Sequence, residues 1–191
     1  ISDSNACLLE DSILIGYTPV YNGEEICAVS TDTLFGTHVL IWNKTPNKGT
    51  RFYRVYGANS ASGTFSLINT IPYDTFSLFP DTNSMHLNKV WYYQLRAVDS
   101  CGNEGSGSLV QPNLYLQITS NNQLNWNNIS SVPGATNIKV WRSINSGAFQ
   151  QIATLASTAS SYIDTTATGV SRRYYLEVDL MPNCHINIGG I

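Results

Sequence analysis

The sequence predicts an all-β protein made of two similar β-sandwiches in tandem. Hydrophobic and polar residues alternate along short runs, and Gly, Asn, Pro and Ser interrupt these runs about every 8 to 12 residues. Helical periodicity is almost absent, so sheets are expected to bury the hydrophobic side chains, which form 42% of the 191 residues. One order of motifs also occurs twice along the chain, which predicts two copies of one structural unit.

The first repeated element is a strand with the pattern Leu-x-Trp. The stretch "HVLIWNKT" (38–45) matches "NQLNWNNI" (122–129), so that Trp126 is the counterpart of Trp42. Because side chains alternate between the two faces of a strand, the Leu and the Trp of each copy share one face. We expect this face to be part of the core.

The second repeated element is a hairpin. "FYRVYG" matches "NIKVWR", with Val140 as the counterpart of Val55, and each stretch is followed by a Ser-Gly pair at Gly63 or Gly147. Glycine next to serine between two alternating runs favours a tight turn. Each unit is therefore expected to contain a strand, a turn and a returning strand here.

The last repeated element is a strand that ends near a cysteine. "WYYQLRAVDSC" matches "YYLEVDLMPNC", which aligns Trp91 with Tyr174 and Cys101 with Cys184 at nearly the same spacing as the earlier matches. The residues expected to alternate toward the core are Trp91, Tyr93, Leu95 and Ala97 in the first unit and Tyr174, Leu176, Val178 and Leu180 in the second. A Trp side chain on one sheet that faces, on the other sheet, a strand beginning with aromatic residues predicts a sandwich core.

In this order and at this spacing, the motifs resemble those of the fibronectin type III module, with its Trp on strand B, Tyr-x-Val on strand C and alternating aromatic and aliphatic residues on strand F. The resemblance implies two immunoglobulin-like (fibronectin type III) β-sandwiches in tandem. The modules are expected at residues 25–110 and 111–191, and residues 1–24 are expected to end a preceding module or to add an edge strand. Trp91 stands where the family usually has a Tyr, and the second module ends on a thin final strand, "HINIGGI".

A narrower resemblance rests on "EICAVSTDTLFGTHVLIW", "AVDSCGNEG" and "YLQITSNNQLNWN". Together these stretches are similar to the tandem fibronectin-like modules near the C-termini of large secreted surface proteins of Bacteroidetes, which the type IX system often exports. The resemblance implies a piece of a longer protein that is secreted or held at the cell surface. Neighbouring domains of the same polypeptide are then its first expected partners.

Composition argues against two classes of partner. Charged residues form only 12% of the chain, the net charge is −3, and the longest basic run is the pair Arg172 and Arg173. Nucleic-acid binding needs a larger basic footprint, so none is expected. Membrane insertion is not expected either, because no apolar stretch approaches the length of about 18 residues that a membrane-spanning helix requires.

The four cysteines stand singly at Cys7, Cys27, Cys101 and Cys184, without a Cys-x-x-Cys pair, so neither a metal site nor a cofactor is expected. The fibronectin resemblance places Cys27 at the start of strand A and Cys101 in the turn after strand F, at one end of the sandwich. It thereby implies a disulfide between them and an extracytoplasmic location. The alternative is two free thiols in a reduced protein. Cys184 is left with Cys7, with a cysteine outside this sequence, or with no partner.

The sequence does not predict an enzyme. A catalytic Ser or Cys needs an adjacent base, and the three histidines, His38, His86 and His185, lie apart in a strand, a loop and the tail. His38 alternates onto the core face of its strand. Asp81 and Asp164 recur at equivalent turns, which favours a structural Asx turn in both units over a catalytic role.

Four aromatic residues have the opposite parity from the core positions and are candidates for ligand binding: Tyr56, Tyr92, Trp141 and Tyr175. A flat aromatic row could bind a polysaccharide, whereas ordinary cross-strand packing would explain the same pattern. The predicted function is a non-catalytic spacer that also mediates adhesion or assembly, with a polysaccharide or a cell-surface protein as a further partner. The alternative is a carbohydrate-binding accessory module of a secreted hydrolase.

Overall fold

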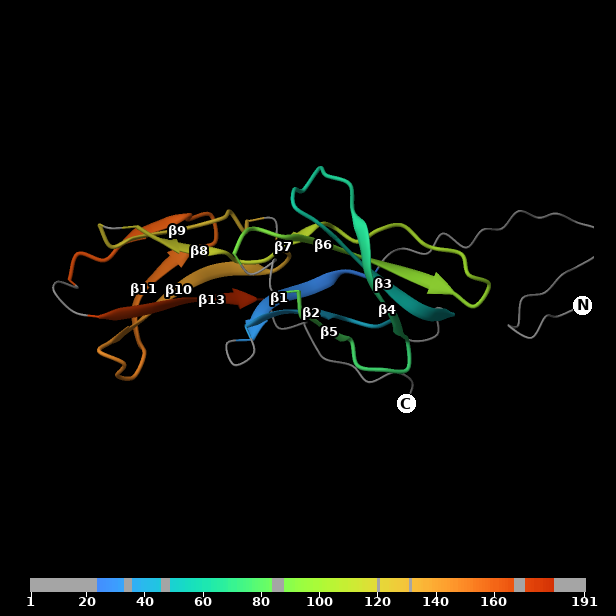
Figure 1. The fold of residues 1–191 in the computed structure, drawn as a ribbon, viewed down its shortest axis with the longest axis horizontal. Coiled ribbons are helices and arrows are strands. Elements are labelled where there is room, and N and C mark those ends of the chain that lie inside the picture. Colours follow the sequence, from blue (N-terminus) through green and yellow to red (C-terminus); the bar gives the residue numbers. More distant parts are fainter. Residues whose placement is uncertain are drawn as a thin grey trace, which may run out of the picture.

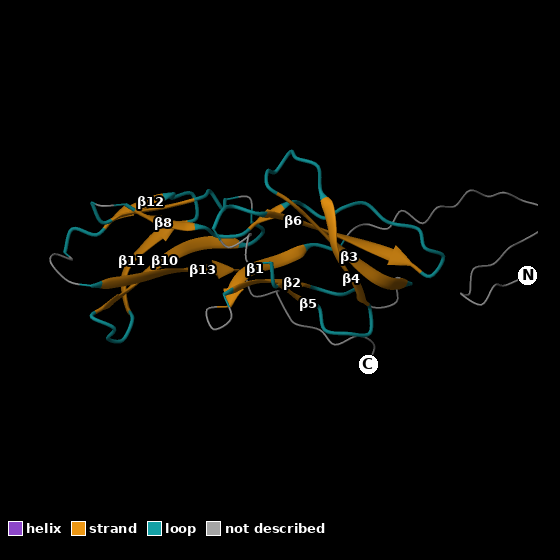
Figure 2. Ribbon diagram, viewed as in Figure 1, coloured by secondary structure: helices purple, strands orange, loops and turns teal. Residues whose placement is uncertain are grey.

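The computed structural model describes residues 24–32, 36–45, 49–83, 88–119, 121–130, 132–166 and 171–180. These residues form strands and loops, with four antiparallel sheets and no helix among them (Figure 2). In this part of the chain, therefore, no helix is long and apolar enough to cross a membrane. The predicted roles of residues 1–23, Cys7, His86, Cys184 and His185 lie outside the described residues.

Two sheets formed by the strands between Ile26 and Pro112 make the first sandwich. One sheet has the order β1-β2-β5, and the other has the order β4-β3-β6-β7. The strands are β1 (Ile26–Asp32), β2 (Thr37–Trp42), β3 (Thr50–Ala58), β4 (Ser66–Pro72), β5 (Leu78–Asp81), β6 (Tyr92–Asp99) and β7 (Gln111–Pro112).

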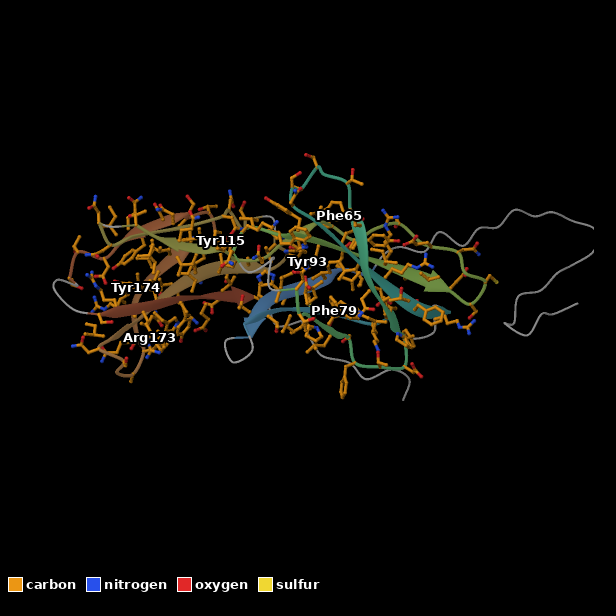
Figure 3. All side chains as sticks on the ribbon, in the orientation of Figure 1. Phe65, Phe79, Tyr93, Tyr115, Arg173 and Tyr174 are labelled. Atoms are coloured by element: carbon orange, nitrogen blue, oxygen red, sulfur yellow. The ribbon has the colours of Figure 1, made fainter. Side chains whose placement is uncertain are left out.

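The core of the first sandwich follows the predicted alternation. Leu40 and Trp42 on β2, Tyr53 on β3, and Tyr93 and Leu95 on β6 are all 0% exposed. The Trp42 and Tyr53 rings meet edge to face at 5.4 Å across the two sheets. The predicted Leu-x-Trp face is therefore confirmed as a core face. Figure 3 shows the side chains of both sandwiches, with the core residues Phe79 and Tyr93 labelled on the first.

The strands between Leu116 and Leu180 repeat this plan in a second sandwich. One sheet has the order β12-β9-β8, the other β11-β10-β13. The strands are β8 (Leu116–Ile118), β9 (Gln123–Trp126), β10 (Ala135–Ile144), β11 (Gln150–Ala156), β12 (Ser161–Ile163) and β13 (Arg172–Leu180). Among the described residues, β13 has no neighbour equivalent to β7.

The pairing registers correct the predicted match of the last repeated strand. Val55 lies opposite Leu95 on β6, and its counterpart Val140 lies opposite Leu176 on β13, so Leu176 is the counterpart of Leu95. Tyr93, rather than Trp91, is thus the counterpart of Tyr174. The sequence match is shifted by two residues, which is one full period of strand alternation. A shift of two residues leaves every side chain on the same face, so the hydrophobic pattern does not reveal it.

The four sheets form two all-β sandwiches in tandem, as the sequence predicted, and Figure 1 shows them end to end. β7 ends at Pro112 and β8 begins at Leu116, so only three residues connect the sandwiches. The change from the first sandwich to the second lies close to the module boundary expected between residues 110 and 111. That this boundary separates two domains remains a prediction.

Candidate functional site

A buried chain of polar side chains lies at the end of the first sandwich that adjoins the second. His38 on β2 is 2% exposed, and its Nδ1 lies 2.9 Å from the Tyr93 hydroxyl oxygen. The Tyr93 hydroxyl donates a hydrogen bond to Asp81 Oδ2 at 2.8 Å. On the other side of the imidazole, Asn113 Nδ2 lies 3.0 Å from His38 Nε2. His38 therefore occupies the core face predicted for it, within a hydrogen-bonded chain.

The backbone around Asn113 determines the direction of each hydrogen bond. Asn113 Oδ1 accepts from the Trp91 backbone N–H at 2.8 Å, and Nδ2 donates to the Lys89 carbonyl oxygen at 3.1 Å. The amide nitrogen consequently faces His38, and because an amide N–H₂ can only donate, His38 Nε2 must accept. The imidazole is then neutral, with its proton on Nδ1 and directed at the Tyr93 oxygen.

Asn113 also connects the two sandwiches. Its backbone carbonyl accepts a hydrogen bond from Asn127 Nδ2 at 2.9 Å, and Asn127 Oδ1 accepts from the Tyr115 backbone N–H at 2.8 Å. Asn113 itself is 1% exposed. The short connection is thus held by side chains from both sides, which sequence spacing alone does not reveal.

Asp81 and Asp164 perform the structural task expected of them. Asp81 Oδ1 accepts from the Asn83 backbone N–H at 3.1 Å, and Asp164 Oδ1 accepts from that of Thr166 at the same distance, which is the Asx turn predicted for both units. Each aspartate also accepts a tyrosine hydroxyl, and for Asp164 this is Tyr174 at 2.7 Å.

Asp164 carries a charge in a buried position. It is 1% exposed and lies 2.8 Å from the guanidinium of Arg142. Burial raises the pKa of Asp164, but hydrogen bonds from Arg142, Tyr174 and Thr166 to the carboxylate outweigh burial and lower it to about 2. The carboxylate is therefore ionised at neutral pH.

A second buried charged cluster lies around Tyr53. Glu24 is 4% exposed, accepts the Tyr53 hydroxyl on Oε2 at 2.6 Å and accepts the Thr45 backbone N–H on Oε1 at 2.9 Å. Lys44 is 9% exposed, donates to the Tyr73 carbonyl and sits over the Tyr73 ring. Burial lowers the pKa of Lys44, and the charge of Glu24 opposes that effect. No sequence motif predicted this cluster.

The structure divides the four candidate aromatics into two separate pairs. Trp141 on β10 and Tyr175 on β13 are directly paired and stack with ring centroids 5.7 Å apart and an interplanar angle of 9°. Phe149 meets Tyr175 edge to face at 4.8 Å, and the guanidinium of Arg173 lies 5.5 Å from the Phe149 ring centroid. The sequence pattern missed Phe149, which precedes β11 and so has no strand parity.

Tyr56 and Tyr92 lie on the other sandwich. Tyr56 donates its hydroxyl to Glu104 Oε1 at 2.7 Å, and the guanidinium of Arg96 lies 5.0 Å from its ring centroid. Tyr92 pairs with Pro112 at the end of the sheet. The four residues do not form one continuous row, and only Trp141 and Tyr175 stack on each other.

Cys27 is the second residue of β1, and Cys101 lies in the turn that follows β6. Both cysteines are disulfide-bonded. The Cys101 backbone N–H is also held by Asp99 Oδ1 at 2.9 Å. That Cys27 and Cys101 are bonded to each other stays a prediction.

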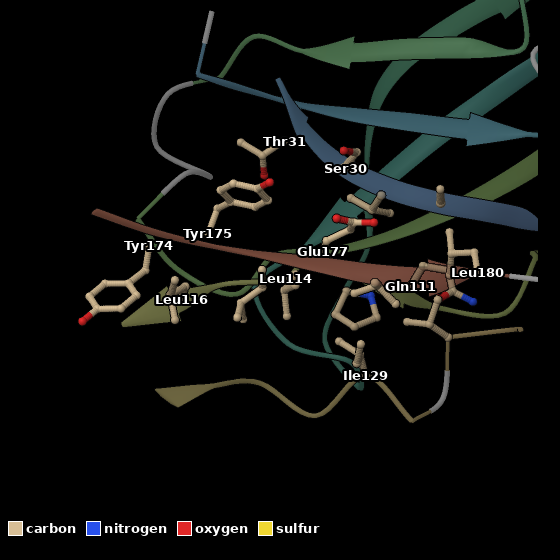
Figure 4. A pocket seen from close by; sticks show the side chains of 16 residues that line it. Ser30, Thr31, Gln111, Leu114, Leu116, Ile129, Tyr174, Tyr175, Glu177 and Leu180 are labelled. Carbon is tan, nitrogen blue, oxygen red and sulfur yellow. The ribbon is translucent and has the colours of Figure 1, made fainter. Parts of the chain in front are cut away.

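A cavity of about 510 Å³ lies where β1 of the first sandwich approaches β8 and β13 of the second (Figure 4). Aliphatic side chains such as Leu114, Leu116 and Leu176 line most of it. Gln111 is a polar exception, and Tyr175 points toward Thr31 across one end. No local sequence pattern indicates this cavity, because residues far apart in the chain form it.

No protein-family model matches the chain, and no curated protein matches it. Among solved structures, the chain is similar to an Fn3-like protein from Clostridium thermocellum, with 23% sequence identity and a TM-score of 0.42. The similar region covers 51% of this chain and 95% of that protein.

Proposed function

We propose that this chain is a non-catalytic pair of fibronectin type III-like modules that acts as a spacer and as an adhesion or assembly element of a larger bacterial protein. The observation that carries this proposal is the hydrogen-bonded connection at Asn113. A spacer that transmits position or force needs a connection that resists bending, and a flexible Gly/Ser linker would not supply one. Asn113 is 1% exposed and is bonded to residues of both sandwiches.

We place the protein outside the cytoplasm, either secreted or at the cell surface. The disulfide-bonded state of Cys27 and Cys101 supports this location, because such bonds persist in oxidising compartments. The similarity of the sequence motifs to modules of secreted Bacteroidetes surface proteins supports it too and suggests export by the type IX system. Neighbouring domains of the same polypeptide and a cell-surface protein are the partners proposed.

The Cys27 to Cys101 disulfide belongs to this proposal. It would close a loop of about 75 residues, worth roughly 4 kcal/mol at most through the entropy of the unfolded chain. Peptide mapping of the unreduced protein should recover both cysteines in one cross-linked peptide pair. Recovery of Cys27 or Cys101 joined to a different cysteine would reject the pairing.

Backbone ¹⁵N relaxation measured by NMR tests the spacer directly. If the connection is rigid, amides of β3 and β6 and amides of β10 and β13 should fit one elongated rotational diffusion tensor. The variant Asn127→Ala should separate the two sets, because it removes the side-chain donor to the Asn113 backbone carbonyl and the acceptor for the Tyr115 backbone N–H. Thr119→Ala, which changes an exposed residue past β8, is the matched control and should leave the common tensor intact. Independent tumbling in the unmodified protein would contradict the spacer.

The stacked pair of Trp141 and Tyr175 favours carbohydrate binding as a second candidate function. Together with Phe149, which is 37% exposed, the pair forms an aromatic group on one sheet face of the second sandwich. Affinity electrophoresis against soluble plant, algal and bacterial polysaccharides tests this function. Retardation that disappears in Trp141→Ala but persists in Tyr56→Ala would favour a carbohydrate-binding accessory module. Unchanged mobility on every polysaccharide would remove this candidate.

A further inference from the structure

The cavity between the sandwiches is lined by consecutive residues of two strands. Four consecutive residues of β1 (Ala28 to Thr31) and five of β13 (Tyr174 to Val178) line it. Consecutive residues of a strand point to opposite faces, so a cavity that touches all of them runs along the strand edge rather than over one face. In the described part of the chain, β1 and β13 each pair with a strand on one side only. Among the described strands, two unpaired edges therefore flank the cavity.

Gln111 supplies a polar group that nothing in the described structure satisfies. The residue is 2% exposed and lines the cavity, and neither its side-chain oxygen nor its side-chain nitrogen has a hydrogen-bond partner there. Buried amides are normally paired, because an unpaired one loses its hydrogen bonds to water without replacement. Figure 4 shows Gln111 close to Leu180 at the end of β13. An occupant of the cavity would be able to pair this amide.

We propose that this cavity binds an extended segment of a separate polypeptide, which adds as a strand along the free edge of β13 while the Gln111 carboxamide pairs with one of its peptide units. A carboxamide can donate one hydrogen bond and accept another, side by side, as a peptide group does. The Gln111 carboxamide therefore suits a peptide backbone as its partner better than a hydrocarbon or an anion. Strand addition at an open sheet edge is an established mode of peptide recognition.

The lining defines the chemistry of the segment. Leu176 and Val178 of β13 and Leu114 and Leu116 face the cavity, so every second side chain of the segment should be aliphatic. The charged lining residue, Glu177, is paired with Lys139 at 3.3 Å, which leaves little charge to attract an ionic ligand. From Tyr174 to Leu180 the strand covers about 20 Å at roughly 3.3 Å per residue, which suits a segment of about seven residues.

The inference rests on the assembly role proposed above and names the contact through which assembly would occur. It does not depend on the rigid connection, because relaxation measurements test that feature separately. A flexible connection with peptide binding would contradict the spacer alone, and a rigid connection without peptide binding would contradict this inference alone.

The test uses a fluorescein-labelled seven-residue peptide that alternates valine and threonine, with binding measured by fluorescence anisotropy. The matched control peptide has the same side chains but is N-methylated at alternate residues, so that one edge loses its backbone donors. We expect the first peptide to bind and the second to bind at least tenfold more weakly. Amide signals of β13 and β1 should shift on binding, whereas those of β4 should not.

The variant Gln111→Leu gives two readouts of opposite sign. It removes the unpaired amide, so thermal stability of the free protein should rise, yet peptide affinity should fall by about tenfold. Gln150→Leu, on the exposed part of β11, is the control variant and should leave affinity unchanged. Absence of peptide binding, or equal binding of the N-methylated peptide, would overturn the proposal. Self-association of the chain that blocks peptide binding would also overturn it, since a second copy would then fill the cavity.

Discussion

Acidification should selectively destabilise the second sandwich through Asp164. The pKa of this carboxyl is held at about 2 in the folded protein, against an ordinary value of 3.8, by its hydrogen bonds from Arg142, Tyr174 and Thr166. A depressed pKa in the folded state contributes stability above pH 3.8, and that stability is lost as the pH falls toward 2. At about 1.36 kcal/mol per pH unit, the contribution is about 2 kcal/mol.

The assay is urea unfolding between pH 7 and pH 2, followed by NMR signals of each sandwich, because two sandwiches need not unfold in one step. The variant Asp164→Asn should cost about 3 kcal/mol at pH 7, since it leaves Arg142 without its buried anion. It should also lose most of the stability change between pH 4 and pH 2. Asp179→Asn is the matched control, because the Asp179 side chain is 33% exposed in its ion pair with Lys139. This substitution should lower the free energy of unfolding by less than about 1 kcal/mol.

Two results would refute this reasoning. One is an unmodified second sandwich whose stability does not fall between pH 4 and pH 2. The other is an Asp164→Asn variant that falls as steeply as the unmodified protein, because the acid sensitivity would then come from other groups.

Two further predictions concern the first sandwich. His38→Phe should lower the free energy of unfolding in urea by roughly 2 kcal/mol, because Asn113 loses a buried acceptor. His38→Gln keeps a donor and an acceptor and should recover part of the loss. Equal stability of all three proteins would contradict the hydrogen-bonded chain. Burial, followed by hydrogen bonds to Glu24 and Asp81, raises the pKa of Tyr53 and Tyr93 far above 10.0. The stability of the first sandwich should therefore fall as the pH rises past 10.0. Absorbance at the phenolate wavelength should show that Tyr53 and Tyr93 ionise only when the protein unfolds. A Tyr53→Phe and Tyr93→Phe double variant should lack this delayed component, and phenolate signals from both residues in the folded protein would refute the assignment.

The fold was predictable because its signals are local. Alternation along a single strand already places Leu40 and Trp42 on one face, and the repeat then transfers the same assignment to Leu124 and Trp126, which are 0% and 6% exposed. Register between strands is not local in this sense. A slip of one full period of alternation preserves every hydrophobic position, which is why the sequence match aligns Trp91, rather than Tyr93, with Tyr174.

The site features were harder to predict because they depend on residues brought together across the fold. Asn113 meets His38 from 75 positions away, and nothing in either local sequence marks the pair. Glu24 is charged and would ordinarily be expected at the surface, but the Tyr53 hydroxyl and a backbone N–H compensate its burial. Gln111 offers the least local signal of all, because its significance lies in the partners that its buried amide lacks.

The two sandwiches share one plan but differ in closure, and this difference bears on where a partner could attach. In the described residues, ten core side chains of the first sandwich are buried, and buried polar clusters around Tyr53 and Tyr93 close both ends of its core. The second sandwich has five such side chains, and every core-facing residue of β13 remains partly exposed. A sheet edge that keeps its apolar side chains partly exposed still has hydrophobic area to bury. Binding free energy is therefore available at β13, whereas the closed core of the first sandwich suits the role of a spacer.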